Sequence, residues 1–250
     1  MSDTPVPPRL AATLLLVRDD PFEVLMVRRA ARRDDLFSSA LVFPGGVVDP
    51  EDRDAAWLDR IEGAEDLSDE ERALRIAGCR ECFEEVGILL AREARGLCPP
   101  LDAAPGGRDF RALVAAARGR LRLQDLAHFA HWITPEMAPR RFDTHFFLCR
   151  APEGVEAVCD GRETVALEWV APGALLARPA AEAGSIPFPT RLNLMRLAES
   201  GDVERALAAA RARPRFTVRP RPVRRDGKLV ITIPVEAGYG VTEDWLPRKA

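Results

Sequence analysis

The chain has 250 residues, of which 47 % are hydrophobic and 30 % are charged. These proportions are typical of a globular protein that buries a sizeable core. A formal net charge of −3 excludes a general electrostatic attraction to nucleic acid or to anionic membrane. Five scattered cysteines argue against a disulfide framework, and the longest apolar run, residues 10–17, is too short to span a bilayer. With no recognisable signal peptide, the expected location is the cytoplasm.

Apolar runs separated by turn residues predict the elements of the first half of the chain. After a Pro-rich start, strands are expected at residues 11–17 and 23–27, and a buried strand leads into Gly45-Gly46. A long helix then ends at Gly87. Residues 89–125 are expected to form a helical annex, with helix over 89–95 and 109–121.

The second half of the chain alternates between strand and helix patterns. Strands are expected at 126–133, 144–149 and 165–170, helices at 172–176, 190–199 and 203–213, and a hairpin around Asp226-Gly227, which is a strong two-residue turn signal. Mixed strands and helices predict an α/β or α+β fold with extra C-terminal helices and a hairpin at 190–250.

The most informative stretch is residues 80–88, Arg-Glu-Cys-Phe-Glu-Glu-Val-Gly-Ile. At ~100° per residue, Glu81, Glu84 and Glu85 share one arc of a helix, while apolar residues cover the opposite arc. Like charges at this spacing repel each other, and a bound divalent cation would remove that penalty. Carboxylate oxygens are the ligands that Mg²⁺ and Mn²⁺ prefer. A solvated acidic helix face is the alternative explanation.

Ahead of this helix, Leu41-Val42-Phe43-Pro44-Gly45-Gly46 reads as a buried strand that ends in a Gly-Gly turn, where backbone can approach a phosphate closely. A Gly-rich turn followed by this helix closely resembles the Nudix hydrolase signature, G-x5-E-x7-R-E-U-x-E-E-x-G-U, in which U is apolar. The second half matches at every specified position, with Cys82 in the apolar slot. In the first half Gly46 fits, and Asp52 stands where the family has Glu.

The spacing departs from the family pattern, since 27 residues separate Asp52 from Arg80 where the signature has seven. The insertion, at about residues 53–71, is polar, and Ser68 with Glu71 forms a capping box that restarts the helix. It is therefore expected to be a surface excursion that leaves the helix intact, although the role of Asp52 stays open. An enlarged box of this kind resembles the branch of peroxisomal coenzyme A diphosphatases.

The resemblance implies a single Nudix domain over residues 1–250, folded as an α/β/α sandwich with a mixed central sheet. It also implies metal-dependent hydrolysis of a nucleoside diphosphate linked to another group. Glu81, Glu84 and Glu85 would bind Mg²⁺ or Mn²⁺, and Arg80 and Gly87 would support them. Glu81 and Glu84 are also catalytic candidates. The general base is either Glu163, in a loop before a late strand, or Glu81.

Two arginine-rich segments are candidates for substrate binding. Arg28, Arg29, Arg32 and Arg33 precede the Gly45-Gly46 turn, and Arg29 is selected there as a phosphate ligand. Arg140, Arg141 and Phe142 stand at the mouth of a strand, where they could hold a phosphate and stack on an adenine. Solvated surface arginines are the alternative for both segments.

Cysteine and histidine patterns are weaker. Cys79-x2-Cys82 lies on the apolar face of the helix, so core packing is favoured over zinc binding. His128, His131 and His145 have no metal-binding spacing and are expected to be structural.

The leading interpretation is a diphosphatase that cleaves coenzyme A or acyl-CoA to 3′,5′-ADP and (acyl-)4′-phosphopantetheine. ADP-ribose or another dinucleotide is the alternative substrate. A non-catalytic Nudix-fold nucleotide-binding or regulatory protein is the alternative of another class. The expected partner is a small nucleotide, without nucleic acid or membrane, and a homodimer through the C-terminal hairpin is compatible with the sequence.

Overall fold

The computed structural model describes residues 5–31, 38–93, 96–97, 109–179 and 185–245. Its largest sheet has eight strands, with six in the order β11-β2-β1-β10-β9-β12 and with β3 and β4 paired to β2 and β1. The strands are β1 (Arg9–Arg18), β2 (Glu23–Arg29), β3 (Leu41–Val42), β4 (Gly45–Val47), β9 (Ala127–Ile133), β10 (Phe142–Arg150), β11 (Thr164–Val170) and β12 (Thr217–Val218). The β1–β10 and β12–β9 pairs are parallel and the others antiparallel, so the sheet is mixed, as expected.

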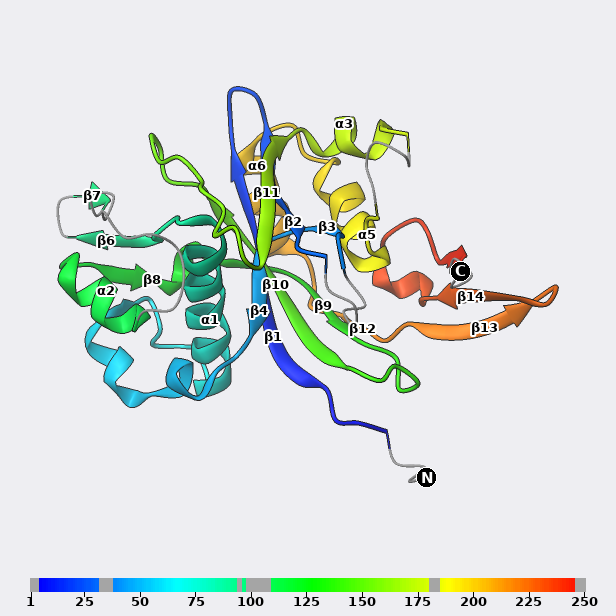
Figure 1. Cartoon of the computed structure of the whole chain (residues 1–250), viewed down its shortest axis with the longest axis horizontal. Helices are drawn as coiled ribbons and strands as arrows, with labels where there is room; N and C mark the ends of the chain where they lie inside the picture. Colours follow the sequence, from blue (N-terminus) through cyan, green and yellow to red (C-terminus); the bar gives the residue numbers. More distant parts are fainter. Residues whose placement is uncertain (1–4, 32–37, 94–95, 98–108, 180–184, 246–250) are drawn as a thin grey trace.

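Helices cover both faces of this sheet. Helix α1 (Asp69–Val86) packs on one face, whereas α3 (Pro172–Ala177), α5 (Phe188–Leu197) and α6 (Val203–Ala212) pack on the other. In Figure 1, α1 lies to the left of the sheet and α3 and α5 to its right. The central strand β1 is apolar on both faces because Leu14 and Leu16 belong to the α1 side and Leu15 and Val17 to the other. The expected α/β/α sandwich is therefore confirmed.

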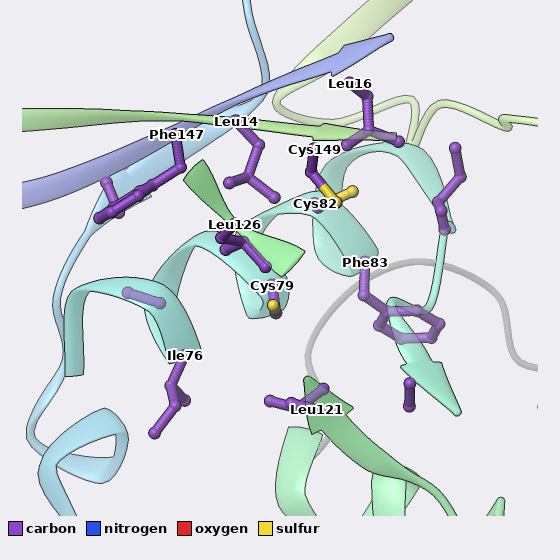
Figure 2. Packing of buried hydrophobic residues seen from close by; sticks show 14 of the residues in the cluster. Leu14, Leu16, Ile76, Cys79, Cys82, Phe83, Leu121, Leu126, Phe147 and Cys149 are labelled. Atoms are coloured by element: carbon purple, nitrogen blue, oxygen red, sulfur yellow. The ribbon is translucent and has the colours of Figure 1, made fainter. Parts of the chain in front are cut away.

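The apolar arc of α1 is buried as its sequence predicts. Figure 2 shows Ile76, Cys79, Cys82 and Phe83 pointing into a cluster with Leu14 and other core side chains. Both cysteines are fully buried, and burial raises their pKa well above the usual thiol range. They pack in the core, as the sequence favours.

Helix α1 begins and ends at the predicted residues. Ser68 accepts from the Glu71 N–H at 3.2 Å, while the Glu71 carboxylate accepts from the Ser68 N–H at 3.3 Å, so the capping box is formed. Gly87 adopts a left-handed conformation with φ of 71° and donates its N–H to Phe83 O, which suits a glycine at this cap.

The insertion is more than a polar surface excursion. The 3-10 helix η1 (Pro50–Arg53) leads into it, and the insertion itself forms a second 3-10 helix, η2 (Ala55–Asp59), followed by β5 (Ile61–Glu62). Strand β5 pairs in parallel with β8 (Arg120–Arg122), in a second sheet that also contains β6 (Ala91–Glu93) and β7 (Gly96–Leu97). Trp57 is buried, and its ring lies 5.6 Å from the ring of Phe110. The insertion and the annex thus share one core with α1.

Only part of the annex is helical. Helix α2 spans Phe110–Ala116, but residues 91–93, which were expected to be helical, form β6 instead. After the left-handed turn at Gly87, residues Ala91 and Arg92 pair with β8, and this non-local pairing outweighs the local helical composition. Much of the annex, residues 94–95 and 98–108, lies outside the described residues.

The C-terminal hairpin follows its turn signal. Strands β13 (Arg221–Arg225) and β14 (Lys228–Thr232) flank Asp226 and Gly227, whose φ values of 49° and 74° are those of a type I′ turn. Strand β15 (Glu243–Trp245) completes a three-stranded sheet with them. No helix in the described part of the chain is both long enough and apolar enough to cross a bilayer.

Candidate active site

Arg80 lies at the centre of a buried polar network between α1 and the strand β4. Its Nη1 donates to Glu81 Oε1 and to Glu84 Oε2, both at 2.9 Å. Its Nη2 donates to the Val47 backbone oxygen at 2.8 Å, which ties the end of β4 to the helix. Arg80 therefore orients two of the three predicted metal ligands.

Asp52 completes this network. Its Oδ1 and Oδ2 accept from Arg80 Nε and Nη2 at 3.0 and 2.9 Å, and Asp52 is only 2 % exposed. Its Oδ2 also accepts from the Asp49 N–H at 2.9 Å, so η1 holds it in place. The inserted residues thus loop out after Asp52, and Asp52 stays in direct contact with helix α1.

The two glycines of the turn allow β4 to approach α1 closely. The Gly45 N–H donates to Glu85 Oε2 at 3.0 Å. A Cβ atom added to Gly46 would lie 2.4 Å from the Glu81 carboxylate, and one added to Gly45 would lie 2.4 Å from the Ala12 backbone oxygen. Position 45 therefore needs glycine because it faces the backbone of β1, and glycine at position 46 lets the Glu81 carboxylate lie directly against the turn.

The three glutamates lie in surroundings that disfavour their charged forms. Burial, reinforced by the nearby charge of Glu81, raises the pKa of Glu85 to about 8. Burial likewise raises the pKa of Glu81 to about 7, although Arg80 opposes this shift. The pKa of Glu84 is also raised, chiefly by burial. A divalent cation would favour the ionised form of all three side chains, and their oxygen donors suit Mg²⁺ or Mn²⁺.

The three carboxylates have different partners in this structure. Arg80 holds Glu81 and Glu84, whereas Glu85 faces the Gly45 N–H and lies 3.9 Å from Arg29 Nη1. Their ligand atoms do not form a group within 4.8 Å of one another, which among the described residues only His131, Asp143 and His145 do. The three predicted metal ligands thus share the polar side of α1 without the spacing of a formed ion site, and Arg29 lies near Glu85.

The loop that carries Glu163 is attached to the end of α1. The Glu85 backbone oxygen accepts from Thr164 Oγ1 at 2.9 Å and from the Asp160 N–H at 3.2 Å. The carboxylate of Asp160 in turn accepts from the N–H groups of Arg162, Glu163 and Thr164. The Glu163 side chain is exposed, and its charge is close enough to raise the pKa of Glu85. Glu163 thus lies at the rim of the glutamate cluster.

A family model described as NUDIX domain matches residues 7–191. The chain belongs to the Nudix family. A human protein named acyl-coenzyme A diphosphatase NUDT19 is 30 % identical over 210 residues, covering 60 % of this chain and 54 % of the relative. A Caenorhabditis elegans protein named putative nudix hydrolase 7 is 26 % identical over 234 residues, covering 90 % and 71 %. The chain spans about half the length of the human relative.

Solved structures agree with this assignment. The crystal structure of a NUDIX hydrolase from Alicyclobacillus acidocaldarius matches with a TM-score of 0.69 and 31 % sequence identity, covering 85 % of this chain and 100 % of that chain. The Nudix box of the present chain is therefore Gly46 to Ile88, with Asp52 and Arg80 paired across the insertion.

The predicted arginine segments differ in their relation to the Nudix box. Arg29 is near Glu85, whereas Arg32 and Arg33 lie outside the described residues. Phe142 pairs with Arg9 of β1, three residues before Ala12, which pairs with Gly46. At ~3.3 Å per residue, this places Phe142 roughly 10 Å further along the sheet. In Figure 1 the turn before β10 lies well away from α1.

Arg141 has partners of its own. Its Nη1 donates to the Val6 backbone oxygen at 2.8 Å and its Nε to that of Thr134 at 3.2 Å. These bonds attach the segment ahead of β1 to the turn before β10. Arg140, in contrast, is exposed. Of this pair, the more accessible side chain for a ligand is Arg140.

The histidines form a group that the sequence does not reveal. His131 Nε2 lies 2.5 Å from Asp143 Oδ1, and His145 Nε2 lies 3.7 Å from the same atom. The spacing Asp143-x-His145 predicts a shared strand face, but the partner residue on β9 depends on register. A register shift that skips Phe129 places His128 on that face too, 5.6 Å from the His145 ring. The spacing of the histidines in the sequence gives no sign of this group, and their structural role stays a prediction.

Proposed function

We propose that this protein is a Nudix diphosphatase that hydrolyses coenzyme A or acyl-CoA to 3′,5′-ADP and (acyl-)4′-phosphopantetheine. The observation that carries the proposal is the network of Arg80 with Glu81 and Glu84, against the turn whose Gly45 N–H contacts Glu85. It joins buried carboxylates to a backbone segment that a diphosphate could approach.

Glu81, Glu84 and Glu85 would hold Mg²⁺ or Mn²⁺. When bound, the ion neutralises charge on the diphosphate oxygens and lowers the pKa of the attacking water. Arg80 positions Glu81 and Glu84 through hydrogen bonds from its Nη1, and Asp52 holds Arg80 in place. Gly45 and Gly46 let the turn pack directly against Glu81 and strand β1, and Arg29 lies near enough to Glu85 to meet a phosphate on the same metal ion.

Two residues compete as the general base. Glu163 is exposed at the rim, where it could accept a proton from a water molecule on the substrate side. Glu81 has a pKa of about 7, which suits a base at neutral pH, but it is also a proposed metal ligand. A Glu163 variant separates the two, as discussed below.

The substrate choice is supported by two independent features. The human relative bears the name acyl-coenzyme A diphosphatase, as does a chicken relative that is 29 % identical over 215 residues, covering 60 % of this chain and 54 % of the relative. In addition, Arg140 and Phe142 lie along the sheet from the Nudix box, where they could meet the adenosine end of the substrate. We also propose that residues 1–250 form one domain, because the insertion and annex share the core of α1.

The test is a mass-spectrometric product assay with coenzyme A and acyl-CoA, run beside ADP-ribose and diadenosine polyphosphates with Mg²⁺ or Mn²⁺. Wild type should release 3′,5′-ADP. Glu84→Gln should lower turnover by ~10²-fold or more, because metal-assisted charge stabilisation is worth several kcal/mol. The matched control is Glu70→Gln, an exposed glutamate in the first turn of the same helix, which should retain activity.

Other outcomes assign the alternatives. Cleavage of ADP-ribose or another dinucleotide, without cleavage of coenzyme A, would support the role of the glutamates and contradict coenzyme A as the substrate. Tight nucleotide binding without any cleavage would support the non-catalytic binding or regulatory protein. A cytoplasmic location and a homodimer stay predictions, to be checked by fractionation and by light scattering.

A further inference from the structure

Two histidines and an aspartate meet on the face of the central sheet that carries α1. His131 of β9 and His145 of β10 are direct cross-strand partners, and Asp143 lies two residues before His145 on the same face. One ligand atom of each side chain lies within 4.8 Å of the others. None of these residues belongs to the Nudix box or contacts its glutamates in any bond described above.

The surroundings of His131 suit a ligand role. Its Nδ1 lies 2.9 Å from Thr217 Oγ1 on the neighbouring strand β12, while its Nε2 faces Asp143. Metal-binding histidines usually form such a hydrogen bond with their second ring nitrogen, which fixes the ring orientation. The three side chains are 17 %, 25 % and 18 % exposed for His131, Asp143 and His145, so an ion can reach them from solvent.

We propose that His131, Asp143 and His145 form a second cation site that binds a divalent transition-metal ion, in first place Zn²⁺. The ligand atoms would be the two Nε2 atoms and Asp143 Oδ1. Two imidazoles with one carboxylate suit Zn²⁺, whereas Mg²⁺ prefers oxygen ligands alone. Three protein ligands leave at least one coordination position open.

Binding of an ion would change the distances between the ligand atoms only slightly and would change the orientation of the two rings. In a tetrahedral site with bonds of ~2.0–2.1 Å, two ligand atoms lie roughly 3.3 Å apart. The contact of Asp143 with His131 would therefore lengthen from 2.5 Å and that with His145 would shorten from 3.7 Å. The two rings are stacked, with centroids 3.9 Å apart and planes at 23°, so binding would also turn them toward a common point.

Such an ion would connect β9 to β10 directly and to β12 through Thr217. These three strands form one side of the central sheet, and β1 separates them from β2 and β11. The ion would therefore stabilise the folded state by RT ln(1 + c/Kd), where c is the free Zn²⁺ concentration, so the effect rises with the logarithm of that concentration.

The experiment is a calorimetric titration of the metal-stripped full chain with Zn²⁺. An excess of Mg²⁺, which prefers oxygen ligands, is present to occupy the glutamates of the Nudix box. Wild type should bind one Zn²⁺. His145→Asn should lose this binding, and Thr217→Val, which keeps all three ligands, should weaken it by about 10–100-fold. The matched control is His128→Asn, since this ring lies 5.6 Å from that of His145 but outside the group of three. It should bind Zn²⁺ as wild type does.

Failure of the wild type to bind Zn²⁺ would overturn the proposal. Binding by His145→Asn and Thr217→Val that is as tight as that of the wild type would overturn it as well. Loss of the bound Zn²⁺ in Glu84→Gln alone would overturn it too, because the ion would then belong to the Nudix box. A crystal soaked in Zn²⁺ gives a direct answer, with an anomalous peak expected between the three side chains. None of these readouts depends on hydrolytic activity.

Discussion

Asp52 and Arg80, 28 positions apart in the sequence, form a buried two-point ion pair with N–O distances of 3.0 and 2.9 Å. The pair bridges the insertion and connects η1 to the helix that carries the glutamates. Arg80 can therefore present its Nη1 to Glu81 and Glu84 while its remaining donors are satisfied.

Asp52→Asn should destabilise the fold. Breaking a buried ion pair leaves a buried charge with fewer partners and costs about 3–5 kcal/mol, with the low end expected because Arg80 keeps Glu81 and Glu84. Urea denaturation measures the free energy of unfolding. Asp66→Asn, an exposed change in the same insertion, should shift it by less than ~0.5 kcal/mol. Equal stability of both variants would show that the pair does not support the fold.

Gly45→Ala should lower stability, whereas Gly46→Ala should lower activity. The new Cβ at position 45 meets backbone atoms of Ala12 and Thr13, which cannot move aside, so overpacking should cost about 1–3 kcal/mol of stability. At position 46 it meets the end of the Glu81 side chain, which can rotate away. Gly46→Ala should therefore fold and lose activity. Thermal melts and turnover separate the two effects, with Gly201→Ala as a control whose Cβ would meet only the end of the Arg205 side chain at 3.9 Å.

Glu163→Gln tests the general base. If Glu163 accepts the proton from water, kcat should fall by about 10²–10⁴-fold. The matched control is Glu153→Gln, an exposed loop glutamate, which should leave kcat unchanged. A loss of less than tenfold would transfer the role to Glu81.

Glu85→Gln should change how stability depends on pH in the absence of divalent metal. The folded-state pKa of Glu85 is raised from 4.5 to about 8, so the folded protein keeps a proton that the unfolded chain releases. Stability should therefore fall as pH rises through this window, by at most ~1.4 kcal/mol per pH unit for one proton, and level off above it. Denaturation midpoints in a chelating buffer measure this slope. Glu85→Gln should reduce this slope and leave the part that comes from Glu81 and Glu84, whereas Glu70→Gln should not change it.

Local patterns predicted much of this structure. The capping box at Ser68 and Glu71, the left-handed Gly87, and the hairpin at Asp226-Gly227 depend on near neighbours in the chain, and all three are present. Helical periodicity likewise separated the buried cysteines from the acidic arc of α1. Helix expected over residues 91–93 was wrong because β6 is stabilised by pairing with β8, about thirty positions away.

By itself, the sequence determined the family and the side chains that face one another within α1, because these follow from spacing along one helix. Only the tertiary structure decided three further relationships. Asp52 reaches Arg80 across the insertion, Arg141 turns to the backbone of Val6 and Thr134, and His131 meets Asp143. Each depends on strand register or loop closure between distant segments, which no local pattern encodes.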